Sequence, residues 1–151
     1  MAWLLSPTPA GASSAGAPRV GAGKPRRVLL VDDDAEMRSL LTDVLQDEGF
    51  EVLQASNGAE ALIILHREAF SAIVLDKNMP GLSGMELLPG LRIICPQTPV
   101  ILITAFGDER TAEEAEERGG AGVLFKPFHM DDLCTMLQHA LVAQEAPANP
   151  A

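Results

Sequence analysis

The sequence predicts an α/β protein with a doubly wound, five-stranded parallel sheet flanked by five helices. Short apolar segments rich in branched residues alternate with segments whose apolar residues recur at helical spacing, and the connections between them are short. The chain of 151 residues, 47% of them hydrophobic, is large enough for one such domain and its core.

The first two units of the alternation follow one another directly. Residues 26–31 and 51–55 are short branched runs and predict buried strands. Asn57, with Glu60 three residues later, predicts the capped start of a helix that runs to about residue 69. The helix between the two strands ends at Gly49, and its apolar residues fall on one face: Met37, Leu40, Leu41, Val44 and Leu45.

Three further units complete the sheet. We expect strands over residues 71–76, 100–104 and 123–125, and helices over residues 83–94, 108–118 and 131–143. Pro89 should shorten or kink the first of these helices. The helix over 108–118 offers only Ala112 and Ala115 as inward apolar residues, which predicts weak packing.

The two ends of the chain differ from the body in composition. Residues 1–25 are rich in Ala, Gly, Ser and Pro and predict a disordered tail, and residues 144–151 predict a second one. The folded domain should therefore span residues 26–143.

Charge and composition exclude several classes of protein. The net charge is −10, and residues 1–27 hold four of the 11 basic residues and none of the 21 acids. An acidic body disfavours direct binding of nucleic acid. No apolar run reaches the roughly 18 residues needed to cross a bilayer. Two cysteines, Cys95 and Cys134, are too few for a disulfide scaffold and indicate a reducing, cytoplasmic location.

Polar side chains follow the strands at one edge of the predicted sheet. Asp32, Asp33 and Asp34 follow the first strand, Asp76 ends the third, Thr104 ends the fourth and Lys126 follows the fifth. Ligands of such sheets bind outside the carboxyl ends of the strands. Crowded carboxylates need a cation, and a hard ion such as Mg²⁺ suits them. One carboxylate beside the metal can then act as a nucleophile toward a phosphoryl group.

Four segments carry a family resemblance: VLLVDDD, LDKNMPGLSG, ITAFGD and LFKPF, in this order and spacing. They resemble the response-regulator receiver domain of two-component signalling, and the resemblance covers about residues 26–143. It implies the flavodoxin-like strand order 2-1-3-4-5. It also implies Asp76 as the phosphoacceptor and a cis bond before Pro127.

The same resemblance assigns the other site residues. Asp33 would ligate Mg²⁺ directly, Asp32 would act through a water of the metal, and Asp76 and the backbone carbonyl of Asn78 would complete the protein's ligands. Thr104 would bond a phosphoryl oxygen, and Lys126 would pair with the phosphoryl group. Taken singly, these residues have ordinary explanations as helix caps, strand ends or solvated lysines, and we expect Asp34 to be the cap of its helix.

Two positions depart from the family pattern. Val123 stands where the family usually places an aromatic residue, and Phe125, two residues on, lies on the same side of the strand. Lys77 follows the phosphoacceptor where an apolar residue is common. Transmission of the signal is therefore less strongly predicted than phosphorylation.

We expect a stand-alone receiver that takes a phosphoryl group on Asp76 from a sensor histidine kinase or a histidine phosphotransfer protein. It would catalyse its own phosphorylation and dephosphorylation, and signal by protein contact or onward phosphotransfer. An unknown downstream partner would bind helix 108–118, strand 123–126 and helix 131–143. The alternative is a pseudo-receiver that binds proteins without phosphorylation. A haloacid-dehalogenase-like phosphatase is disfavoured because Asn78 stands where its proton-donating acid is needed.

Overall fold

The computed structural model describes residues 26–79, 83–105 and 109–145. Five parallel strands form one sheet in the order β2-β1-β3-β4-β5, which confirms the expected topology. The strands are β1 (Arg27–Val31), β2 (Glu51–Ala55), β3 (Ala72–Asp76), β4 (Val100–Thr104) and β5 (Gly122–Phe125). Their ends lie within one residue of the predicted ends.

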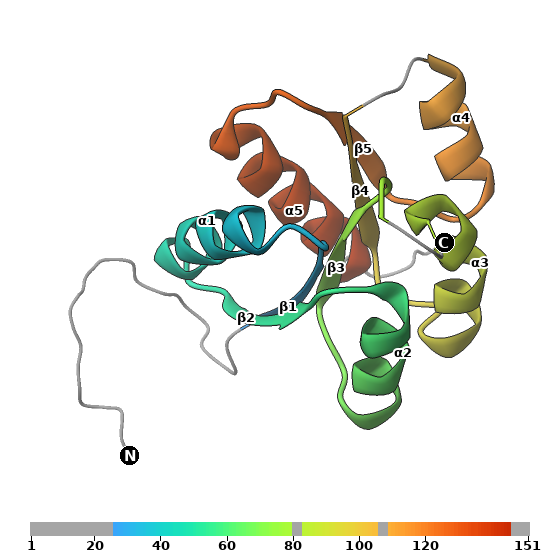
Figure 1. The fold of residues 1–151 in the computed structure, drawn as a ribbon, viewed down its shortest axis with the longest axis horizontal. Helices are drawn as coiled ribbons and strands as arrows, with labels where there is room; N and C mark the ends of the chain where they lie inside the picture. Colours follow the sequence, from blue (N-terminus) through green and yellow to red (C-terminus); the bar gives the residue numbers. More distant parts are fainter. Residues whose placement is uncertain (1–25, 80–82, 106–108, 146–151) are drawn as a thin grey trace.

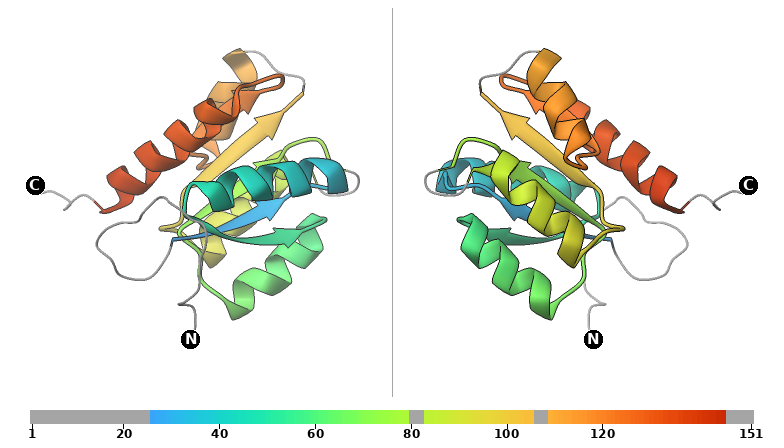
Figure 2. Two further views of the ribbon diagram at one scale, coloured as in Figure 1. Left: turned by 90° about the vertical axis from the view of Figure 1, so that its left-hand side faces the viewer. Right: turned by 90° about the vertical axis from the view of Figure 1, so that its right-hand side faces the viewer.

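In the described part of the chain, five helices cover the two faces of the sheet (Figure 1). They are α1 (Ala35–Asp47), α2 (Gly58–Arg67), α3 (Gly84–Ile94), α4 (Glu109–Glu117) and α5 (Met130–Glu145). Figure 2 shows α1 and α5 on one face, and α2, α3 and α4 on the other. The last helix extends two residues beyond the predicted end at 143. The predicted tail over 1–25, and the part of the other tail over 146–151, lie outside the described residues.

The described residues form two apolar core clusters, one on each face of the sheet. Alternate residues of a strand point to opposite faces, so Leu29 and Val31 join the cluster under α2, α3 and α4. Val28 and Leu30 join the cluster under α1 and α5. All residues of β3 and β4 are buried, as expected of central strands in a parallel sheet. The residues at the carboxyl edge of the sheet thus extend from strands that are themselves fully buried.

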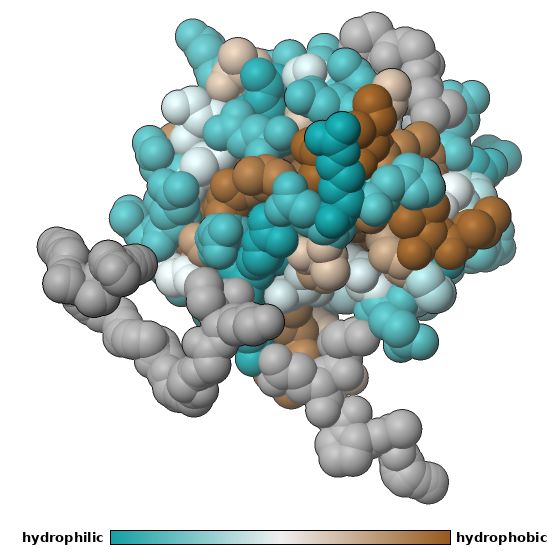
Figure 3. Space-filling model, turned by 90° about the horizontal axis from the view of Figure 1, so that it is seen from below, coloured by the Kyte–Doolittle hydropathy of each residue, from teal (hydrophilic) through white to brown (hydrophobic). Residues whose placement is uncertain are grey.

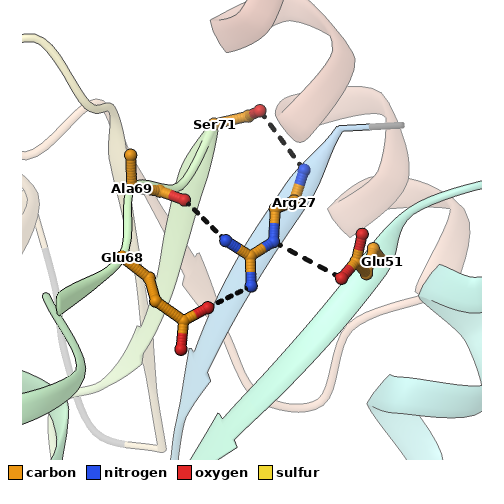
Figure 4. Close-up of polar contacts among 5 residues, drawn as sticks. All are labelled: Arg27, Glu51, Glu68, Ala69 and Ser71. Atoms are coloured by element: carbon orange, nitrogen blue, oxygen red, sulfur yellow. Dashed lines mark hydrogen bonds and ion pairs between the residues drawn. The ribbon is translucent and has the colours of Figure 1, made fainter. Parts of the chain in front are cut away.

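Arg27 fastens the opposite, amino-terminal edge of the sheet (Figure 4). Its guanidinium lies 3.5 Å from the Glu51 carboxylate on β2 and 2.5 Å from the Glu68 carboxylate after α2. It also donates to the Ala69 carbonyl at 3.1 Å and lies over the Phe70 ring, 4.7 Å from its centroid. One side chain therefore joins β1, β2 and the loop that leads into β3.

Helix α4 packs through Ala115, as expected, and through Thr111, which was not predicted from the sequence. Thr111 and Ala115 are buried, whereas Ala112 is only half-buried. Residues three and four apart share one face of a helix, so Ala115 lies beside both Thr111 and Ala112. Ala115 is buried as expected, Ala112 is partly buried, and the other buried residue is the polar Thr111.

Pro89 does not shorten α3, which continues to Ile94. A proline inside a helix has no N–H for the carbonyl four residues earlier, here that of Met85. The Arg118 guanidinium donates to this Met85 carbonyl at 3.2 Å and contacts Glu114 at 3.3 Å. The arginine that follows α4 thus supplies the hydrogen bond that the proline removes.

The surface is mostly polar. Seen from below, apolar side chains interrupt the polar surface in separate patches (Figure 3). Among the residues that the structure describes, the large apolar residues that are exposed come from five different elements: Leu40, Ile63, Ile93, Phe125 and Val142. Within the described ranges, no helix has both the length and the hydropathy required to cross a membrane.

Candidate functional site

Three carboxylates meet at the carboxyl edge of the sheet. Asp32 and Asp33 follow β1, and Asp76 ends the adjacent strand β3, in which Leu75 pairs with Val31. One oxygen from each of these three carboxylates lies within 4.8 Å of the others. Asp32 and Asp76 are 2% and 4% exposed, whereas Asp33 is open to solvent. The structure therefore places two of the acids inside the site and one at its mouth.

The environment of Asp32 opposes its negative charge. Burial, and secondarily the nearby Asp76 carboxylate, raise the pKa of Asp32 to about 6. The Asp34 backbone N–H, which donates to Asp32 Oδ1 at 2.9 Å, and the Lys126 ammonium lower this pKa but do not cancel the increase. Near neutral pH the site thus holds buried negative charge that its own cations do not balance.

This donor set suits a hard divalent cation. Three carboxylates from two strand ends offer oxygen ligands close together, and one side of the group is open to water. Mg²⁺ binds through one or two carboxylates, keeps several waters and leaves positions for a phosphate. Asn78 lies against the same group, because its backbone N–H donates to Asp76 Oδ1 at 3.0 Å. The residues present fit a magnesium ion.

Thr104 and Lys126 approach from the next two strands. Thr104 ends β4, which is adjacent to β3, and its side chain is buried. Its hydroxyl donates to Asn78 Oδ1 at 3.1 Å. Lys126 follows β5, its backbone N–H donates to the Thr104 carbonyl at 2.8 Å, and its bond to Pro127 is cis. The edge thus combines acids, a hydroxyl and an ammonium group.

Two further residues support the site and were not predicted from the sequence. A methyl group on Gly84, the first residue of α3, would lie 2.6 Å from the Asp76 carbonyl oxygen, so only glycine allows α3 to start this close to β3. Arg38 on α1 donates to the Asp32 carbonyl at 2.7 Å and to Gln54 Oε1 on β2 at 3.0 Å. It joins the loop after β1 to the neighbouring strand.

Helix caps position the loops around the site. Asp34 accepts from the backbone N–H groups of Glu36 and Met37 at 3.0 and 3.3 Å, which confirms its prediction as the cap of α1. Ser83 and Glu86 form a reciprocal capping box at the start of α3. The Asp34 side chain therefore serves as the cap of α1, whereas the carboxylates of its neighbours Asp32 and Asp33 face the site.

Comparison with known proteins places this geometry in a family. The sequence model of the response regulator receiver domain family matches residues 28–138 of this chain. Response regulator protein FleR of Pseudomonas aeruginosa is 42% identical over 76% of this chain, which spans only 24% of the length of FleR. Sporulation initiation phosphotransferase F of Bacillus subtilis is 36% identical over 71% of this chain and 86% of its own length.

Solved structures agree with the sequence comparisons. A CheY-like receiver domain protein from Methanospirillum hungatei superposes with a TM-score of 0.77 at 27% identity, covering 81% of this chain and 98% of that one. The chemotaxis protein CheY4 of Vibrio cholerae superposes with a TM-score of 0.74 at 33% identity, covering 78% and 99%. The chain belongs to the response regulator receiver domain family.

Proposed function

We propose that this receiver domain accepts a phosphoryl group on Asp76 from the phosphohistidine of a sensor histidine kinase or a histidine phosphotransfer protein. The observation that carries the proposal is the meeting of buried Asp76 with Asp32, Asp33, Thr104 and Lys126 at one edge of the sheet. Family membership supports it, because phosphoryl acceptance on a strand-end aspartate is the chemistry that the resemblance implies.

The transfer is a single displacement at phosphorus. A carboxylate oxygen of Asp76 forms the new bond to phosphorus while the bond from phosphorus to the histidine nitrogen breaks, and that nitrogen keeps the electron pair. The Asn78 backbone N–H holds the Asp76 carboxylate in place by a 3.0 Å hydrogen bond. The Lys126 ammonium and the Thr104 hydroxyl would bond the oxygens of the transferred group.

Asp33 would ligate Mg²⁺ directly, and Asp32 would hold one of its waters. Asp76 and the Asn78 carbonyl would complete the protein's ligands. The ion would neutralise the charge of the carboxylates and of the incoming phosphoryl oxygens. Because the burial of Asp32 leaves negative charge unbalanced, the domain should take up phosphate poorly without the ion.

Signalling would follow from contacts at a surface formed by α4, β5 and α5, or from onward phosphotransfer. Helix α4 buries only a threonine and an alanine among its described side chains, which makes it a candidate for movement. Onward transfer has support from the similarity to the Bacillus phosphotransferase. Action as a stand-alone domain over residues 26–143 has support from response regulator receiver protein CpdR of Brucella abortus, which this chain matches at 35% identity over 98% of its length.

A labelling experiment tests the proposal. The chain is incubated with ³²P-labelled acetyl phosphate, with Mg²⁺ or with EDTA, and incorporation is compared in Asp76→Asn, Asp33→Asn and Lys126→Ala. Incorporation should need Mg²⁺, vanish in Asp76→Asn and fall sharply in the other two. Asp43→Asn, which removes an exposed carboxylate on α1, is the matched control. Labelling of Asp76→Asn equal to wild type, or no labelling of any variant by either acetyl phosphate or a phosphorylated histidine kinase, would refute it.

A further inference from the structure

The side chain of Asn78 holds two donors at the end of β4. Its amide oxygen accepts from the Thr104 hydroxyl and from the Ala105 backbone N–H, each at 3.1 Å. A backbone N–H can only donate, so the atom that faces Ala105 is the amide oxygen and not the nitrogen. The orientation of this side chain is therefore determined by its partners.

The same residue touches the phosphoacceptor through its main chain. The Asn78 N–H donates to Asp76 Oδ1 at 3.0 Å, and Asp76 pairs with Ile103, the residue before Thr104. The two donors held by the amide thus belong to the end of β4 that adjoins Asp76, and under the proposed function they would be within reach of the phosphoryl oxygens. A hydroxyl has one proton to donate, and so has a backbone N–H. Each donor can therefore make a full hydrogen bond to only one of two acceptors, the Asn78 amide oxygen or a phosphoryl oxygen.

We infer that the Asn78 side chain is a placeholder: it occupies the Thr104 hydroxyl and the Ala105 N–H before phosphorylation and releases both to the phosphoryl group. The inference rests on the proposed function and adds a positioning residue to it. An anionic phosphoryl oxygen is a stronger acceptor than a neutral amide, so the two donors exchange their hydrogen bonds to Asn78 for hydrogen bonds to the phosphoryl group. The hydrogen bonds lost from Asn78 oppose this exchange. Asn78 thereby sets how readily the modified state forms.

The expected size follows from the two bonds that compete. A neutral hydrogen bond changes an equilibrium constant by about 2- to 10-fold. Both Asn78 and Ala105 are exposed, so water replaces part of what is lost, and removal of the side chain should favour the modified state by about tenfold. The backbone N–H and carbonyl of residue 78 remain in Asn78→Ala, so Mg²⁺ affinity should stay unchanged.

The test uses beryllofluoride as the phosphoryl mimic on the full chain. Calorimetric titration with Mg²⁺ present should show Asn78→Ala binding it about tenfold more tightly than wild type, with equal Mg²⁺ affinity in a separate titration. In the Mg²⁺-free, unmodified protein, the Ala105 amide should exchange its hydrogen about 2- to 10-fold faster in Asn78→Ala. Asn78→Asp keeps an acceptor oxygen and should retain slow exchange.

The outcomes separate this inference from the proposed function. If the wild type binds no beryllofluoride, the proposed function and the placeholder inference are both refuted. If the wild type binds it and Asn78→Ala binds no more tightly, the placeholder alone is refuted. The placeholder is also refuted if Ala105 exchange is unchanged in Asn78→Ala, or if Mg²⁺ affinity rises in parallel with beryllofluoride affinity. Tighter binding with faster exchange supports the inference.

Discussion

Replacing Asp32 by asparagine should stabilise the metal-free domain at neutral pH. The pKa of Asp32 is raised from 3.8 to about 6, chiefly by burial. A carboxyl group with a raised pKa binds its proton more tightly in the folded state. Its contribution to stability is therefore complete below pH 3.8 and is lost as the pH rises through 6. Asparagine has nearly the same shape, stays neutral and can still accept from the Asp34 N–H.

The magnitude follows from the displacement of the pKa. One pKa unit corresponds to about 1.4 kcal/mol, so the charged Asp32 lowers the free energy of unfolding by about 3 kcal/mol at pH 7.5. Near pH 4 the same calculation leaves less than about 1 kcal/mol. The advantage of Asp32→Asn should therefore grow between pH 4 and 6 and then level off.

Urea denaturation at 25 °C in EDTA, from pH 4 to pH 8, measures this difference. Other carboxylates titrate in both proteins, so subtraction of the two stability curves isolates Asp32. Asp43→Asn controls for the loss of one negative charge. Added Mg²⁺ should stabilise the wild type more than the variant, because ligand binding to the folded state adds to its stability. A difference that is constant across this pH range, or an Asp32→Asn protein that is less stable at pH 7.5, would refute the electrostatic reasoning.

Two further predictions concern α3. Gly84→Ala should lower the free energy of unfolding by about 1–3 kcal/mol, because its methyl group would lie 2.6 Å from the carbonyl oxygen of Asp76, which ends β3. The control is Gly90→Ala, which should be neutral or stabilising because nothing lies within 4 Å of the added methyl group. Equal urea midpoints for the two variants would contradict this prediction. Arg118→Ala should cost about 1–2 kcal/mol and speed hydrogen exchange in α4, because the Met85 carbonyl loses its partner. In a Pro89→Ala background, the loss of stability caused by Arg118→Ala should be smaller, because the N–H of the alanine can donate to the Met85 carbonyl within the helix. Additive losses of stability in this double-mutant cycle would contradict the explanation.

Features with local physical causes were predictable from the sequence. The buried strands appear as branched apolar runs, and Asp34 and Asn57 stand at the helix starts where short polar residues cap. The convergence of Asp76 with Asp32 followed from topology, because parallel strands bring their carboxyl ends to one edge.

Features that depend on contacts between distant elements were not predictable in this way. The bond from Arg118 to the Met85 carbonyl joins residues 33 positions apart, at a carbonyl that Pro89 leaves without its helical donor. Periodicity of the apolar residues pointed to Ala112 and Ala115 on α4, and could not show that the tertiary packing also buries the polar Thr111 while Ala112 is only partly buried. Likewise, Gly84 stands in the family segment LDKNMPGLSG, but the physical reason for it, the close approach of α3 to β3, appears only in the folded structure.

The central claim is that Asp76 carries the phosphoryl group. The most direct measurement reduces the acetyl phosphate-treated chain with sodium borohydride, which converts an aspartyl phosphate to homoserine, and locates the product by tandem mass spectrometry. The account predicts homoserine at position 76 after treatment in Mg²⁺, and none after treatment in EDTA. Homoserine at Asp32 or Asp33 instead, or at no aspartate although phosphate was incorporated, would contradict it.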